Sequence, residues 1–280
     1  MAQYVVSTSI AHAAAMKDKD VAYLAGGTEI NRLGSFVEPQ LIIPLMDYKA
    51  LKGISFANSK FSASDQDKGT YVRIGSLTTF QELIESSIVP SYLKEAASFM
   101  SSLQRRNMAT IGGNVALHRD DSYLCPTLMA CDAKIEILGS EGKKFRITVC
   151  DFILSDDSDN YLILAIYVPV KATVLSKRYA NTASSHGAIT FALGITNECV
   201  FSGVAVKDTY IGPVYDLENF IAKGPSYDEI QKKAKTMFKP FLKNKDDIFG
   251  SAKYKDYLLS VTAATLGTEL LKTYFEGGTL

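Results

Sequence analysis

The order of strand and helix signals changes near Val170, and this change limits the possible folds more than any other feature of the sequence. Before it, short apolar runs typical of strands alternate with short helical segments and end in the run 162–168. After it, the runs 191–196 and 200–206 are spaced as a hairpin, and helical periodicity dominates from Ser226 onward. The pattern predicts an α+β protein without an internal repeat.

The individual elements follow from local signals. In the first part we expect helices over residues 9–16, 80–84 and 90–100, and strands over 21–25, 40–45, 71–75, 133–138, 145–149 and 162–168. In the second part we expect helices over 227–241 and 254–274. Ser9 is the expected cap of the first helix, and Thr78 or Thr79 the cap of the second.

Composition and charge exclude several classes of function. The 280 residues include 30 basic and 30 acidic side chains, so neither nucleic acid nor an anionic membrane is an expected partner. The run 162–168 is the longest apolar stretch, far short of the roughly 20 residues of a membrane span. No basic residue precedes Lys17, so we expect no signal peptide and a soluble, cytoplasmic protein.

The four cysteines give no metal site. Cys125, Cys131, Cys150 and Cys199 form no Cys-x-x-Cys pair, and none has a His at zinc-ligand spacing. We therefore expect four reduced thiols, as in cytosolic proteins.

Two glycine pairs with polar flanks are the main candidates for chemistry. Gly26–Gly27 follows a predicted strand and precedes Thr28, and Gly112–Gly113 lies between Thr110 and Asn114. Consecutive glycines let several backbone N–H groups surround one anion, so both segments are candidate phosphate loops. Neither has the spacing of a dinucleotide fingerprint or a P-loop. Each alone indicates a tight turn, whereas the pair makes a phosphorylated cofactor an equal alternative.

These segments together resemble the FAD-binding subunit or domain of the xanthine dehydrogenase family of molybdenum hydroxylases. The sequence YLAGGTEI at 23–30 is similar to the first flavin loop of that family, and ATIGGNVA at 109–116 to its second. PTLMACDAKIEI at 126–137 is similar to the helix and strand that follow, and IGSLTTFQEL at 74–83 to another family segment. The C-terminal region resembles the small sheet-and-helix domain of the family.

The resemblance implies a fold and a function. We expect a two-subdomain PCMH-type FAD-binding domain over residues 1–170, with subdomains of about 1–54 and 55–170. Residues 171–280 would form a small domain of antiparallel strands and helices, like the C-terminal domain of the CO dehydrogenase flavoprotein. The chain would pass electrons from the [2Fe-2S] clusters of a partner, through FAD, to NAD or another acceptor. Substrate oxidation would take place on a separate molybdopterin-binding subunit.

The resemblance also implies a cofactor site built largely from backbone, with no catalytic residue and no metal ligand. The pyrophosphate would lie on the N–H groups of residues 26–29, with Thr110, Gly112, Gly113 and Asn114 as the opposite wall. The expected FAD-contact residues are Leu24, Ala25, Gly26, Gly27, Thr28, Glu29, Ile30, Gly75, Ala109, Thr110, Ile111, Gly112, Gly113, Asn114, Asp121, Tyr123 and Leu162.

Two segments depart from the family pattern. Tyr123 stands where many relatives have a flavin-contacting Asp; Asp120 or Asp121 is a substitute, unless the two form a plain exposed acidic turn. Residues 183–189 lack the acidic and basic side chains that relatives carry at the start of the C-terminal domain. Both departures resemble the short flavoprotein subunits of bacterial purine or selenium-dependent hydroxylases, and both leave reactivity with NAD open.

Several alternatives stay open at the level of sequence. Arg105 and Arg106 could balance the phosphates, face a partner subunit or form a solvated turn. His118 and His186 are either surface-loop residues or close to the flavin. Two rival functions are a stand-alone flavin reductase of the same fold and a structural subunit without flavin.

Overall fold

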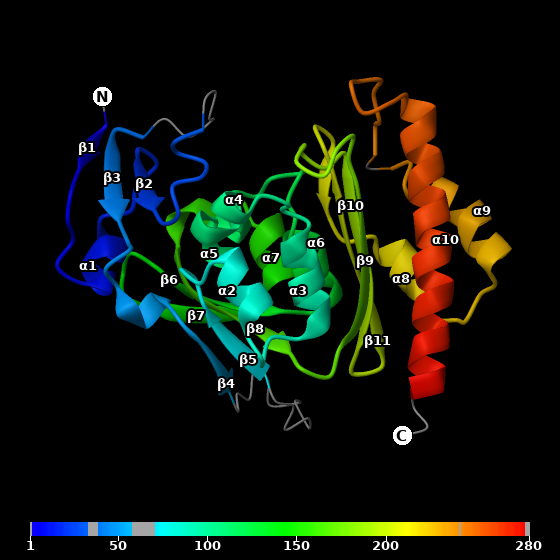
Figure 1. The fold of residues 1–280 in the computed structure, drawn as a ribbon, viewed down its shortest axis with the longest axis horizontal. Coiled ribbons are helices and arrows are strands. Elements are labelled where there is room, and N and C mark those ends of the chain that lie inside the picture. The colour runs from blue at the N-terminus through cyan, green and yellow to red at the C-terminus, as the bar shows by residue number, and fades with distance from the viewer. Residues whose placement is uncertain (1, 33–38, 58–70, 241, 278–280) are drawn as a thin grey trace.

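The computed structural model describes residues 2–32, 39–57, 71–240 and 242–277. Within these residues the strands form three sheets, which follow one another along the chain and across the molecule (Figure 1). The first sheet lies at one end of the molecule and the long C-terminal helix at the other (Figure 1). The mixture of helices with mainly antiparallel sheets confirms the α+β class.

The first sheet is small and parallel, in the order β1-β3-β2. Its elements are β1 (Gln3–Tyr4), α1 (Ile10–Ala15), β2 (Val21–Leu24) and β3 (Leu41–Pro44), followed by the 3-10 turn η1 (Lys49–Leu51). The Ser9 side chain accepts a hydrogen bond from the backbone N–H of His12, so it caps α1 as predicted. The connection from β2 to β3 begins with the glycine pair.

The second sheet is antiparallel and forms the centre of the molecule, in the order β4-β5-β8-β6-β7. Its strands are β4 (Ile54–Ala57), β5 (Tyr71–Gly75), β6 (Lys134–Leu138), β7 (Lys144–Thr148) and β8 (Leu162–Pro169). Every residue of β8 is buried, which explains its uninterrupted apolar sequence. Ile163 and Ile166 enter the main core, whereas Leu162 and Leu164 pack against the first sheet.

Six short helices pack on the second sheet or connect its strands. They are α2 (Phe80–Glu85), α3 (Ser91–Ser98), α4 (Leu103–Met108), α5 (Ile111–Ala116), α6 (Cys125–Ala130) and α7 (Val149–Leu154). A further 3-10 turn, η2 (Ser158–Asn160), precedes β8. Thr79 caps α2 in a capping box with Glu82, which decides between the two predicted caps.

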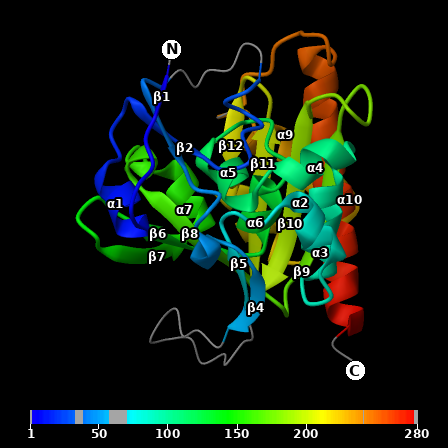
Figure 2. The same ribbon diagram turned by 60° about the vertical axis from the view of Figure 1, so that its left-hand side comes forward.

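The third sheet is antiparallel, in the order β12-β11-β10-β9, and lies between two layers of helix (Figure 2). It comprises β9 (Thr173–Tyr179), β10 (Ile189–Thr196), β11 (Cys199–Val206) and β12 (Tyr210–Gly212). The helices α8 (Tyr215–Ile221), α9 (Tyr227–Met237) and α10 (Ala252–Gly277) follow; α8 and α10 contact its outer face, and α9 packs against these two helices.

Helix α6 packs on the inner face of this sheet through backbone contact. A β-carbon at Gly194 would lie 2.2 Å from the carbonyl oxygen of Ala130, and one at Gly203 would lie 2.1 Å from that of Pro126. The two glycines therefore permit an approach that any side chain would prevent.

Among the predicted boundaries that differ from the structure, two differ for a clear physical reason. The hairpin turn contains two residues rather than three: Asn197 and Glu198 both have positive φ, and Cys199 already belongs to β11. The helix predicted over 227–241 ends at Met237, because Pro240 lacks the N–H that a further turn would need.

Candidate functional site

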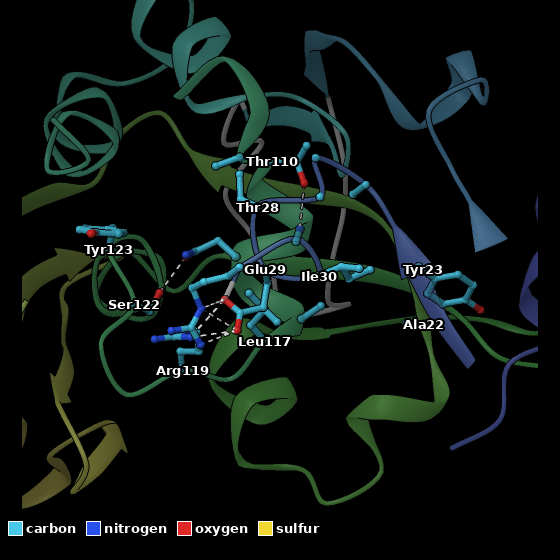
Figure 3. A pocket seen from close by; sticks show the side chains of 18 of the residues that line it. Ala22, Tyr23, Thr28, Glu29, Ile30, Thr110, Leu117, Arg119, Ser122 and Tyr123 are labelled. Carbon is cyan, nitrogen blue, oxygen red and sulfur yellow. Dashed lines mark hydrogen bonds and ion pairs between the residues drawn. The ribbon is translucent and has the colours of Figure 1, made fainter. Parts of the chain in front are cut away.

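A cavity of about 540 Å³ lies where the connection after β2 faces α5 and the segment that joins α5 to α6. Figure 3 shows it from close by: Tyr23 and Tyr123 lie on opposite sides, with Thr28, Glu29 and Thr110 between them. This volume is in the range of pockets that hold small organic ligands or cofactors.

The first wall is the glycine loop, which we define as residues 25–30. Gly27 has a φ of +70°, a conformation that favours glycine. The N–H groups of Gly26, Gly27 and Thr28 donate to no acceptor in the described part of the chain. Three backbone donors on a cavity wall are thus available to a ligand.

The second wall is the start of α5 and not a loop, which corrects the prediction for residues 109–114. Thr110 caps the helix, and its Oγ1 accepts from the N–H of Gly113 at 3.1 Å. The N–H of Ile111 donates to the carbonyl of Thr78 at 3.0 Å, and that of Gly112 to the carbonyl of Ser76 at 2.9 Å. These amides are already used, so this wall offers the cavity its shape and side chains instead.

Twelve of the seventeen expected contact residues line the cavity. They are Ala25, Gly26, Gly27, Thr28, Glu29, Ile30, Ala109, Thr110, Gly113, Asn114, Asp121 and Tyr123. The structure therefore brings together residues from segments nearly a hundred positions apart in the chain.

The other five expected residues lie behind the cavity walls. Ile111 is in the main core, and Leu162 packs between the first and second sheets. Gly112 packs against Ser76, where a β-carbon would lie 2.6 Å from the Ser76 β-carbon, and Gly75 packs equally closely against Leu51. The Leu24 side chain lies beneath Gly27. These residues shape the site from outside it.

Two further lining residues, Arg105 and His186, were open candidates from the sequence. Sequence reasoning missed the others, several of which are charged: Lys17, Lys19, Ala22, Tyr23, Arg32, Pro39, Met100, Ala116, Leu117, Arg119, Ser122, Ser158, Asp159 and Tyr161. No local motif marks these missed residues, since their elements meet only in the folded chain.

A chain of ion pairs crosses one side of the cavity. Glu29 of the glycine loop pairs with Arg32 at 2.7 Å and with Arg119 at 3.2 Å. Arg119 also pairs with Asp121 at 2.6 Å, and Asp121 lies 3.1 Å from Nδ1 of His186. Figure 3 shows the Arg119 guanidinium directed at the Glu29 carboxylate. This series of side-chain contacts joins the glycine loop to the connection between β9 and β10.

Asp121 stays ionised at the centre of this series of ion pairs. Burial by itself would raise the pKa of Asp121, but hydrogen bonds from Arg119 and His186 outweigh it and hold the pKa well below its ordinary value. Only 4% of the residue is exposed, so the acidic-turn interpretation is wrong for Asp121. For Asp120, burial and repulsion from Asp121 and Asp208 raise the pKa instead.

Tyr123 forms an aromatic end of the cavity. It is 8% exposed, and burial raises the pKa of its hydroxyl. The guanidinium of Arg178 on β9 lies 5.3 Å from the centre of its ring, and Arg178 also donates to the carbonyl of Ser185. A residue of the third sheet thus holds the ring of Tyr123 in place.

The structure separates the two neighbouring arginines. Arg105 lines the cavity. Arg106 turns away, donating to Gln81 at 2.9 Å and to the carbonyls of Met100 and Ser101 at 3.0 and 3.2 Å. Both belong to α4, so the solvated-turn interpretation is wrong.

The two candidate histidines also separate. His186 lines the cavity, whereas His118 is not among the lining residues. The Nδ1 atom of His118 lies 3.2 Å from the carbonyl of Ile153, and its ring packs against Phe152 at 5.1 Å between centroids. Burial lowers the pKa of His118, so the ring is held as a neutral packing group.

The described residues contain no group of three or more His, Cys, Asp or Glu side chains arranged to hold a metal ion. Burial raises the pKa of both Cys125 and Cys131 to about 12, which leaves them as packed, unreactive thiols.

No helix in the described ranges has the length and apolar character needed to cross a membrane.

Comparison with known proteins agrees with the site geometry. Residues 1–171 match the family model described as FAD binding domain in molybdopterin dehydrogenase. The chain is 26% identical to the uncharacterized protein YgfM of Escherichia coli over 251 residues, covering 88% of this chain and 86% of that protein. It is 27% identical to the carbon monoxide dehydrogenase medium chain of Afipia carboxidovorans over 230 residues, or 74% of each chain.

A solved structure supports the fold over nearly the whole length. A chain of the reconstituted CO dehydrogenase from Oligotropha carboxidovorans superposes with a TM-score of 0.77 at 20% identity. The superposition covers 97% of this chain and 96% of that one. The arrangement of the three sheets is therefore shared with that chain, although most side chains differ.

Proposed function

Because this chain belongs to the FAD-binding subunits of the molybdenum hydroxylase family, we propose that it passes electrons from iron–sulfur clusters on a partner, by way of FAD, to NAD or another acceptor. The chain is an FAD-binding oxidoreductase component. We propose the direction of electron flow and the identity of the acceptor.

The observation that carries the proposal is the set of available N–H groups on the glycine loop. Gly26, Gly27 and Thr28 present three backbone donors to a cavity of about 540 Å³. Backbone N–H groups in a glycine-rich turn are suited to the oxygens of a pyrophosphate. The opposite wall carries Gly113, which has no side chain to reduce the space. These residues fit the cofactor of the family.

The chain's own residues would bind and orient the cofactor. The N–H groups of the glycine loop and the hydroxyl of Thr28 would hold the pyrophosphate, and Arg105 adds a positive charge on the cavity wall. Tyr123, held by Arg178, offers an aromatic surface. When bound, FAD supplies the redox chemistry, and the protein supplies its position and electrostatic surroundings.

The remaining organisation is proposed on the same premise. We propose an FAD-binding domain over residues 1–170, with subdomains of about 1–54 and 55–170, and a C-terminal domain over 171–280. A molybdopterin-binding subunit and a [2Fe-2S] subunit would be the partners, as expected for a chain similar to a CO dehydrogenase medium chain. A cytoplasmic location suits the four free thiols.

Visible absorption of the purified chain tests the proposal first. We expect a flavin spectrum and, after heat release, chromatographic recovery of about one FAD per chain. A colourless chain that takes up no added FAD would favour the flavin-free structural subunit. Purine turnover by the chain without partners or metal would favour a stand-alone enzyme and contradict the electron-transfer role.

The acceptor requires a second measurement. The FAD-loaded chain is reduced with dithionite without oxygen and then mixed with NAD. Rapid return of the flavin absorption would support NAD as acceptor, whereas no return with NAD but return with an artificial dye would assign another acceptor.

A further inference from the structure

The C-terminal part of the chain reaches the cavity at one point. Among the described lining residues, His186 is the sole one beyond position 170. It lies on the connection between β9 and β10, which is held on both sides: Arg178 donates to the carbonyl of Ser185, and Asn181 donates to the carbonyl of Ile248 at 2.9 Å. Thr182 and Ser185 bond to one another within the same connection. Hydrogen bonds on both sides of His186 therefore hold the segment that carries its imidazole.

The contact that His186 makes joins the two parts of the chain. Its Nδ1 atom lies 3.1 Å from Oδ2 of Asp121, which is nearly fully buried and already engaged by Arg119. Arg119 in turn binds Glu29 of the glycine loop. His186 is therefore connected, through Asp121 and two ion pairs, to the loop whose N–H groups face the cavity.

The charged surroundings of His186 come from three elements. Asp121, Asp120 and Arg119 lie on the segment between α5 and α6, together with Tyr123. Arg178 lies on β9, beside Ser185 and Gly187. Lys207 and Asp208 lie on the turn after β11, where the Lys207 N–H donates to the carbonyl of Ala188. Of these groups, the Asp121 carboxylate is the one that contacts the imidazole.

We propose that His186 is a positioning residue for the cofactor site, and that its protonation slows the loss of bound FAD. This inference rests on the proposed FAD site. In the protonated form the contact with Asp121 becomes a charge-assisted hydrogen bond, which is stronger than that of a neutral ring. The added positive charge also lies on the wall of a cavity that receives a pyrophosphate.

The imidazole of His186 is open to solvent, since 36% of the side chain is exposed. Imidazole is the side chain that ordinarily changes charge between about pH 5 and 8. Asp121 stays ionised in this range because its pKa is held well below the ordinary value. The contact therefore changes through one partner alone.

The test is the rate of FAD release from the full chain, followed by the rise in flavin fluorescence after dilution, from pH 5.5 to 8.5. For the unaltered protein we expect release to quicken about three- to tenfold across this range, as a partly exposed charge-assisted bond weakens. His186→Gln should release FAD quickly at every pH. His186→Lys, which keeps its positive charge, should release FAD slowly at every pH.

A matched control is His12→Gln. His12 is exposed on α1, and its imidazole bonds only to Thr8 among the described residues, so its removal should leave the pH profile unchanged. FAD release that is independent of pH in the unaltered protein, or a His186→Gln profile identical to it, would overturn the role of His186 and leave the FAD site standing. A chain that binds no FAD would overturn both proposals.

Discussion

Gly26 lies directly against the carbonyl oxygen of Met108. A β-carbon placed on Gly26 would be 1.6 Å from that oxygen and 2.6 Å from the carbonyl carbon, far inside van der Waals contact. The glycine loop and the end of α4 thus touch through backbone alone. Because only two residues separate the end of α4 from the start of α5, this one contact fixes the spacing between the two cavity walls.

Gly26→Ala should separate the two walls. The methyl group cannot be accommodated without moving either the loop or α4, so we expect a loss of roughly 2–3 kcal/mol in the free energy of unfolding together with weakened FAD binding. Urea unfolding and FAD titration measure the two effects. Gly142→Ala is the control: Gly142 has positive φ but open space, so about 1 kcal/mol of stability should be lost without any effect on FAD.

Gly113→Val should remove FAD while largely preserving the fold. A β-carbon at Gly113 meets only Oγ1 of Thr110, at 2.9 Å, and the rest of the side chain would enter the cavity. Gly112→Ala should instead lower the stability of the fold, because its β-carbon would collide with Ser76 behind the wall and would not enter the cavity. Thermal unfolding and FAD content of the two variants check the contrast. A Gly113→Val protein with stoichiometric FAD would contradict the assignment of this wall.

Arg105→Gln should weaken FAD binding about three- to tenfold and reduce its dependence on salt, because a positive charge on the cavity wall is lost. Arg106→Gln should leave FAD binding unchanged and lower the free energy of unfolding by about 1–2 kcal/mol, through loss of its bonds to Gln81, Met100 and Ser101. Titrations with FAD at two salt concentrations distinguish the variants. Equal FAD affinities in both would exclude Arg105 from the site.

The sequence was informative wherever a local signal and the tertiary structure agree. The bounds of β5 match the prediction because its apolar and β-branched residues suit a central strand. The extent of α2 was close to the prediction because Thr79 and Glu82 form a capping box, which is a local pattern. The glycine loop was placed correctly after β2 for the same reason: strand, turn and strand succeed one another along the chain.

Elements whose existence depends on distant partners were missed. Helix α4 has no buried residue, and thus no apolar periodicity to reveal it. The start of α5 was predicted as a loop because two glycines disfavour a helix. In the fold, the carbonyls of Ser76 and Thr78 bind the amides of Gly112 and Ile111, and the Thr110 cap adds a third bond. These contacts outweigh the poor helix propensity.

The ion pairs of the site could not be predicted for a similar reason. Glu29 and Arg119 are 90 residues apart, and nothing local to either indicates the other. The pair forms because the glycine loop and the segment after α5 converge on the same cavity. Sequence reasoning kept Asp121 as a candidate only through its position after the second glycine pair, and its burial is a property of the fold.

Asp121→Asn should lower stability in a way that depends on pH. The carboxylate pairs with Arg119 and His186, and the folded protein holds its pKa well below the ordinary value near about 3.9. A carboxylate whose pKa is lower in the folded state contributes its full stabilisation at any pH above its unfolded-state pKa. This stabilisation is lost as the pH falls from the unfolded-state pKa toward the folded-state pKa. We therefore expect the variant to be about 2 kcal/mol less stable than the unaltered protein at pH 7.

The difference in the free energy of unfolding between the two proteins should shrink below about pH 4. In this range the carboxyl group of Asp121 is protonated in the unfolded chain but still ionised in the folded protein. Urea unfolding at pH 7, 5 and 3.5 measures it. Asp120→Asn is the neighbouring control. Burial and like charge raise the pKa of Asp120, so removing its charge relieves repulsion and should cost little or no stability at pH 7. If the deficit of Asp121→Asn were the same at all three pH values, its cause would be lost packing, and the charge of Asp121 would not be what holds this side of the cavity together.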